Sequence, residues 1–117
     1  MIRKIEFYKD YFTDFYSKQN INVQEKIEYV LKLIRQTERI PKKFFEHLTS
    51  TNGLYEIRVE YQSNIYRIFC FFDEGRLIVL INGFQKKTQK TPKKEIEKAE
   101  RLKKEYFNEK EESNGKL

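Results

Sequence analysis

The chain has 117 residues, a formal net charge of +6 at pH 7 and 38% hydrophobic residues, which is enough apolar material for one modest core. No apolar run approaches membrane-spanning length, and charges interrupt the first ten positions where a signal peptide would need an apolar block. We therefore expect a cytoplasmic protein without a membrane partner. The single Cys70 excludes an internal disulfide, and with one histidine no metal site or other cofactor is expected.

The first third of the chain predicts one strand and two helices. Charged and apolar residues alternate in "IRKIEFY" (2–8), which is typical of a short edge strand. Aromatic residues recur at helical spacing over 10–19, and apolar residues do so over 22–39. The connection "KQNIN" offers Asn20 or Asn22 as a cap and is short enough for an antiparallel helical hairpin, which ends at Pro41.

Three apolar segments follow a basic, aromatic connector and predict a β-meander. They are "LYEIRVEY" (54–61), "NIYRIFCFF" (64–72) and "RLIVLINGF" (76–84), and the turns "QSN" and "DEG" between them permit only antiparallel hairpins. The segment "TPKKEIEKAERLKKEYF" (91–107) then has the cap, the proline and the apolar spacing of an amphipathic helix.

The order β-α-α-β-β-β-α predicts a single α+β domain over residues 1–108, with the helices on one face of an antiparallel sheet. Residues 109–117, "EKEESNGKL", are polar and lack an apolar anchor, so we expect a disordered tail there.

Positive charge is concentrated directly after the last predicted strand. The window 84–94 contains no acid, which indicates a polyanionic partner such as RNA; its lysines are Lys86, Lys87, Lys90, Lys93 and Lys94. The last two fall in the first turn of a predicted helix, where the helix dipole disfavours cations unless an anion is bound.

Two arginines lie within the predicted meander. Strand alternation places Arg58 on the face opposite Ile57, where it either meets a ligand or pairs with Glu56 or Glu60. Arg67 interrupts an apolar strand and has no carboxylate close in sequence, which favours a functional role.

We expect both arginines to converge with Lys86 or Lys87 on one concave surface. Tyr55 and Phe84, at the sheet margin, are candidates to stack on RNA bases.

The segments "GLYEIR" (53–58), "YRIFCFF" (66–72) and "GFQKKTQKTP" (83–92) resemble the RelE superfamily of type II toxins, and most closely its HigB branch. The resemblance implies a metal-independent endoribonuclease that cuts mRNA in the ribosomal A site. In that reaction the 2′-hydroxyl of the RNA attacks the adjacent phosphate and leaves a cyclic phosphate. A cognate helix-turn-helix antitoxin similar to HigA is also implied.

By this resemblance, Arg67 stabilises the transition-state phosphate, and Arg58 contacts phosphate or transfers a proton. Lys86 and Lys87 would stabilise the phosphate or the leaving group. Several relatives carry a histidine or tyrosine near the end of the chain, where this sequence reads "KKTQKTP", so the general base is left open. The alternatives are a ParE-like gyrase poison, which acts through protein contacts, and a non-catalytic RNA-binding module.

Overall fold

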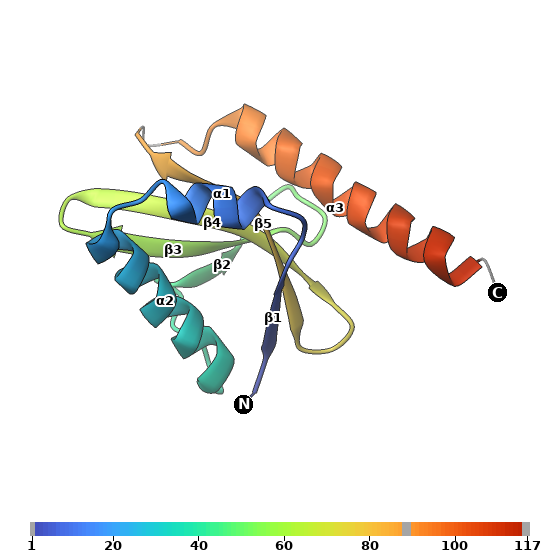
Figure 1. Cartoon of the computed structure of the whole chain (residues 1–117), viewed down its shortest axis with the longest axis horizontal. Helices are drawn as coiled ribbons and strands as arrows, with labels where there is room; N and C mark the ends of the chain where they lie inside the picture. The colour runs from blue at the N-terminus through green and yellow to red at the C-terminus, as the bar shows by residue number, and fades with distance from the viewer. Residues whose placement is uncertain (1, 88–89, 116–117) are drawn as a thin grey trace.

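The computed structural model of the protein describes residues 2–87 and 90–115, and it has an α+β fold, as the sequence predicts. A five-stranded sheet in the order β1-β5-β4-β3-β2 separates two layers of helix (Figure 1). The elements in chain order are β1 (Lys4–Phe7), α1 (Tyr11–Ser17), α2 (Ile21–Gln36), β2 (Phe45–His47), β3 (Tyr55–Tyr61), β4 (Asn64–Asp73), β5 (Leu77–Lys86) and α3 (Lys93–Gly115).

The sheet contains the predicted meander and two further pairings. β3, β4 and β5 are antiparallel neighbours, but β1 pairs parallel with β5, and the connector contributes the short strand β2 beside β3. The sheet is therefore mixed, and the expectation of a purely antiparallel sheet is wrong in this detail. Two parallel strands cannot be joined by a short turn. The chain between β1 and β5, which includes the helical hairpin, is long enough to make the parallel pairing possible.

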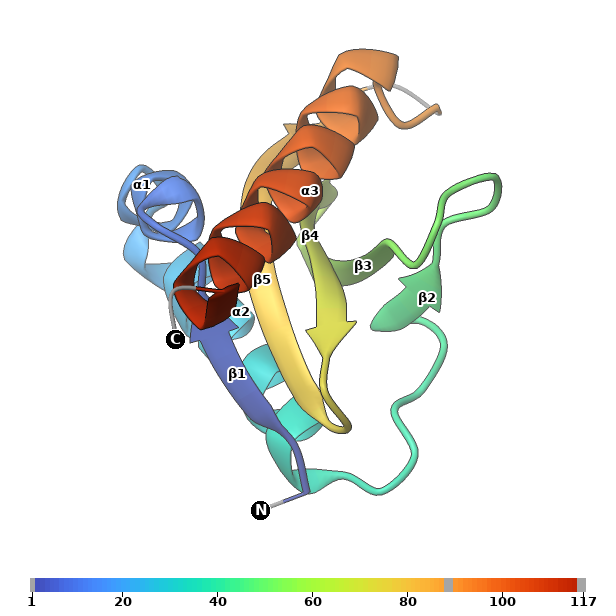
Figure 2. The ribbon, with the colours of Figure 1, turned by 90° about the vertical axis from the view of Figure 1, so that its right-hand side faces the viewer.

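The sequence predicts the helices on one face of the sheet, but they cover both faces (Figure 2). β4 is buried on both sides: Ile68 and Cys70 pack toward α1 and α2, while Phe69 and Phe71 pack toward α3. A strand that is apolar on both faces requires a cover on each, because exposed apolar surface costs free energy.

Helix α2 is fixed at both ends by side chains. Asn20 caps α2, since its Oδ1 accepts a hydrogen bond of 3.0 Å from the backbone N–H of Val23. α2 ends at Gln36, earlier than the predicted end at Pro41, and the Arg3 guanidinium donates to the carbonyl oxygens of Ile34 and Thr37 at 3.0 and 2.6 Å. These bonds satisfy carbonyls that the end of a helix leaves without partners.

Helix α3 continues through the segment that the sequence predicts to be a disordered tail and ends at Gly115, while positions 116–117 lie outside the described residues. Side chains on its second half contact the sheet layer. The Tyr8 hydroxyl lies 3.0 Å from carboxylate oxygens of both Glu105 and Glu109, and Lys110 donates to Asp73 at 2.9 Å. Polar contacts made by Glu109 and Lys110 thus hold this segment, which lacks an apolar anchor.

Among the described residues, no helix combines the length and hydrophobicity of a membrane span.

We predict that Asp73→Asn destabilises the protein at pH 7 and that the difference disappears in acid. Burial alone would raise the pKa of Asp73, but hydrogen bonds from Lys110 and Tyr106 outweigh it and lower the pKa. The stabilisation is therefore complete above the unfolded pKa of about 3.9 and is lost as the pH falls through the lower folded value.

Urea unfolding should show a loss of about 2 kcal/mol for Asp73→Asn at pH 7, shrinking below about pH 4. Glu111→Gln, an exposed change on the same helix, is the control and should have little effect. A pH-independent difference between wild type and Asp73→Asn would contradict this account.

Candidate functional site

The two arginines of the meander lie side by side on the sheet face that α3 partly covers. Arg58 of β3 is directly opposite Arg67 of β4 in the strand register. Ile57 and Val59 pack into the core beneath α2, so strand alternation turns Arg58 to the other face. α3 packs mainly on β5 and β4 rather than on β3 (Figure 2).

Each arginine is balanced by a carboxylate of β3. Like charges directly opposite in a sheet repel, so compensation is needed here. Arg58 binds Glu60 with an Nη2–Oε1 distance of 2.9 Å, which is one of the pairings considered from the sequence. Arg67 forms an ion pair with Glu56, and the two side chains are only 11% and 6% exposed. No carboxylate lies close to Arg67 in the sequence, and the β3–β4 register supplies one from the neighbouring strand.

Lys86, the last residue of β5, completes a group of cations that we call the cation cluster: Arg58, Arg67 and Lys86. Its Cα is aligned with Ile65, two positions along β4 from Arg67 and hence on the same face. Burial lowers the pKa of the Lys86 ammonium group, and the positive charges of Arg67 and Arg58 lower it further. Three adjacent strands thus bring three cations within electrostatic reach of one another.

The cation cluster has hydrogen-bonding capacity that the protein itself does not use. The Nε–H groups of Arg58 and Arg67 are buried and have no acceptor among the described residues. Buried donors without partners are unfavourable and rare in folded proteins. Forked guanidinium groups are suited to phosphate oxygens, and the more exposed Arg58 is the arginine of the cluster that an anionic ligand can reach more readily.

Other residues predicted for the site lie outside the cation cluster. Lys87 is exposed beyond the end of β5, and Lys90, Lys93 and Lys94 are exposed around the start of α3. These lysines could extend the positive surface but do not line the cluster.

Neither aromatic candidate is an open stacking platform. Tyr55 belongs to the core on the α2 side, where its ring stacks on Phe45 with centroids 5.0 Å apart. Phe84 is aligned with Arg67, but its ring is half-buried and packs 5.3 Å from Phe69 beneath α3.

Two acids near Arg67, Glu56 and Glu46, were not predicted from the sequence as its neighbours. Glu46 of β2 lies opposite Glu56 and its charge acts on Arg67. The alternation Glu56-Arg58-Glu60 in "EIRVE" was visible in the sequence, but which acid serves which arginine depends on the register. Within residues 2–87 and 90–115, no group of three or more His, Cys, Asp or Glu side chains is placed to hold a metal ion.

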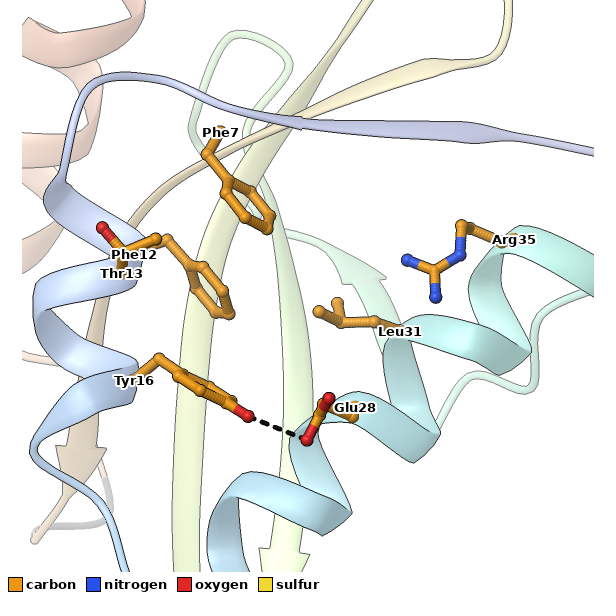
Figure 3. Close-up of a pocket in the computed structure, with 7 residues that line it drawn as sticks. All are labelled: Phe7, Phe12, Thr13, Tyr16, Glu28, Leu31 and Arg35. Atoms are coloured by element: carbon orange, nitrogen blue, oxygen red, sulfur yellow. Dashed lines mark hydrogen bonds between the residues drawn. The ribbon is translucent and has the colours of Figure 1, made fainter. Parts of the chain in front are cut away.

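A separate groove lies between β1, α1 and α2 (Figure 3). It has a volume of about 310 Å³, and its walls are mainly apolar; the lining residues are Phe7, Phe12, Thr13, Tyr16, Glu28, Leu31 and Arg35. The Tyr16 hydroxyl donates to Glu28 at 2.8 Å across one end. The groove shares no residue with the cation cluster, and its apolar walls do not suit a phosphate.

Comparison with known proteins adds a family and a fold. The family model described as phage derived protein Gp49-like (DUF891) matches residues 14–104. The archaeal RelE-RelB complex from Pyrococcus horikoshii OT3 contains a similar chain, with a TM-score of 0.53, 15% identity, and 71% of this chain and 93% of that chain covered.

The RelB-RelE antitoxin-toxin complex from Methanococcus jannaschii gives a TM-score of 0.50 at 14% identity, covering 68% of this chain and 87% of that chain. No curated protein matches the sequence significantly. At these identities the structural matches show the fold, which is RelE-like.

We predict strong coupling between Glu56 and Arg67 in protein stability. Arg67→Met or Glu56→Met alone leaves an unpaired charge in a nearly buried position and should lower the free energy of unfolding by roughly 3 kcal/mol. The double Met variant removes both charges and should unfold close to wild type, because a buried ion pair replaced by apolar groups is often neutral. Urea unfolding of the four proteins gives the coupling, and additive losses would disprove it.

Proposed function

The chain belongs to the family of phage derived Gp49-like proteins and has a RelE-like fold, and from these premises we propose that it is the toxin of a type II toxin–antitoxin system. We infer that it acts as a ribosome-dependent mRNA endoribonuclease of the HigB type. The observation that carries this proposal is the convergence of Arg58, Arg67 and Lys86 on one partly open face of the sheet. Its partners would be the ribosome with mRNA and a cognate helix-turn-helix antitoxin.

The cation cluster suits cleavage of RNA by its own 2′-hydroxyl. The 2′-oxygen forms a bond to phosphorus, the bond from phosphorus to the 5′-oxygen breaks, and the products are a cyclic phosphate and a free 5′-hydroxyl. Negative charge builds up on the phosphoryl oxygens along this path, so fixed cations lower the barrier. Arg67, held by Glu56, would face the phosphoryl oxygens, and Arg58 would share that contact.

Lys86 would donate a proton to the departing 5′-oxygen. A lowered pKa makes its ammonium group a stronger acid than that of an ordinary lysine. The proton of the attacking 2′-hydroxyl is lost to solvent in this scheme. Lys86 therefore supplies both charge and a proton, whereas the arginines supply charge and hydrogen bonds.

The lysines beyond β5 would strengthen binding without touching the reacting phosphate. Lys87, Lys90, Lys93 and Lys94 are exposed, and we assign them a general attraction to ribosomal RNA and mRNA. Contacts of this kind raise affinity at low salt and carry no sequence information.

We predict that Arg67→Lys abolishes mRNA cleavage while leaving the protein folded. Lysine keeps the charge that Glu56 requires, but it lacks the forked donors of arginine, and losing one transition-state donor costs about 100-fold or more in rate. Primer extension on mRNA in a translating extract should show cuts in the A-site codon with wild-type protein and none with the variant. Arg39→Lys, at an exposed position outside the sheet, is the control and should cut normally.

The same assay tests the other readings of the fold. Growth arrest without cuts, together with inhibition of DNA supercoiling, would indicate a gyrase poison. RNA binding without cuts or growth arrest would indicate a binding module. Either outcome would refute the endoribonuclease proposal.

We predict that Lys86→Arg slows the chemical step although it keeps the positive charge. Arginine does not release a proton near neutral pH, so the single-turnover rate at saturating protein should fall about 100-fold. In wild type the rate should decline as the pH rises toward the lowered pKa of Lys86, below the ordinary 10.5, because the proton donor is lost. Lys87→Arg is the matched control and should keep both the rate and its pH profile.

A further inference from the structure

A small pocket lies at the edge of the sheet next to the cation cluster, and we call it the edge pocket. It has a volume of about 130 Å³ and is lined by Lys26, Lys43, Phe44, Arg58 and Glu60. β2 pairs with β3 up to Ile57, and the backbone N–H of Arg58 then donates to the Phe44 carbonyl at 2.9 Å. The connector, β3 and α2 therefore meet here, and Arg58 belongs to both the pocket and the cluster.

The edge pocket contains more positive than negative charge. Lys26, Lys43 and Arg58 are its cations, and Glu60 is its one acid. Within the described part of the chain, neither lysine forms an ion pair with a carboxylate, and Glu60 is already bound by Arg58. The ammonium groups instead lie on aromatic rings: Lys26 is 5.2 Å from the Tyr29 centroid, and Lys43 is 4.9 Å from that of Phe44.

Convergent cations repel one another, and a bound anion removes this repulsion. The volume of about 130 Å³ leaves room for a phosphate group. Arg58 also retains an Nε–H without an acceptor. The excess of positive charge in the lining favours an anion of the size of a phosphate group.

We propose that the edge pocket is a second phosphate subsite, which binds the phosphodiester next to the one that is cleaved. This assignment rests on the proposed function for the identity of the strand, but the phosphate chemistry follows from the pocket itself. Arg58 would contact both phosphates, and Lys26 and Lys43 would hold the flanking one. Glu60 competes with that phosphate for Arg58, and since its side chain is 59% exposed it can turn into solvent when the phosphate enters.

Two sets of variants with opposite expected effects test the subsite. The probe is a single-stranded RNA octamer with 2′-O-methyl groups, which cannot be cleaved, and its affinity is measured by fluorescence anisotropy over a salt series. Lys26→Gln with Lys43→Gln should weaken binding up to about tenfold and reduce the salt slope by about one. The matched control is Lys4→Gln with Lys32→Gln, which removes the same charge at exposed positions outside the pocket.

The acid should behave in the opposite way. Glu60→Gln removes the competing carboxylate and should tighten binding of the octamer by up to about fivefold. Glu38→Gln changes the net charge equally at an exposed position that pairs with Arg76, and it should have a smaller effect. Thermal unfolding of each variant verifies that the fold is retained.

Inorganic phosphate separates a free anion from an RNA phosphodiester as the source of the ligand. A shift of the Arg58 Nε–H resonance by phosphate, lost in the Lys26/Lys43 variant, supports a site that accepts either source. A shift with the octamer alone supports a site that needs the strand.

The subsite is overturned if the lysine pair matches its control and Glu60→Gln matches Glu38→Gln, even when the wild type cleaves mRNA. Conversely, the expected binding differences without ribosomal cleavage would leave the subsite standing and refute the endoribonuclease.

Discussion

The pairing of β3 with β4 places two guanidinium groups directly opposite each other, and the arrangement of charge on this face follows from that contact. Arg58 and Arg67 would repel without compensation, and β3 supplies Glu56 and Glu60 on the same face. The two acids differ in environment, because Glu56 is nearly buried and Glu60 is exposed. Arg67 is thereby fixed, while the partner of Arg58 can exchange with solvent or with an anion.

A buried ion pair is a poor source of stability, since desolvation offsets the attraction between the charges. Its effect here is to define where the Arg67 side chain lies. An arginine held in one orientation needs no reorganisation when charge builds up on a ligand, which is the property that electrostatic catalysis requires.

The position of α3 determines how much of the sheet face remains available. Its first turn is tied to β5 through Asn82, whose Nδ2 donates to Glu95 at 3.0 Å, and its second half is tied to Asp73 through Lys110. Between these anchors, Leu102 of the helix packs with Phe71 and so covers the apolar part of the face. In the charged part next to β3, Arg58 and Glu60 stay accessible, whereas Arg67 and Glu56 are nearly buried.

Local sequence patterns determined the helices, the meander, the Asn20 cap and the face on which Arg58 lies, because each depends on spacing within a few residues. They also located the lysine-rich segment after β5. The tertiary structure alone decided the parallel β1–β5 pairing, the placement of α3 on the second face and the helical continuation to Gly115. It likewise paired Arg67 with Glu56, turned Tyr55 into the core and brought Lys26 and Lys43 to Arg58. These features depend on strand register and on contacts between residues distant in sequence, which periodicity does not encode.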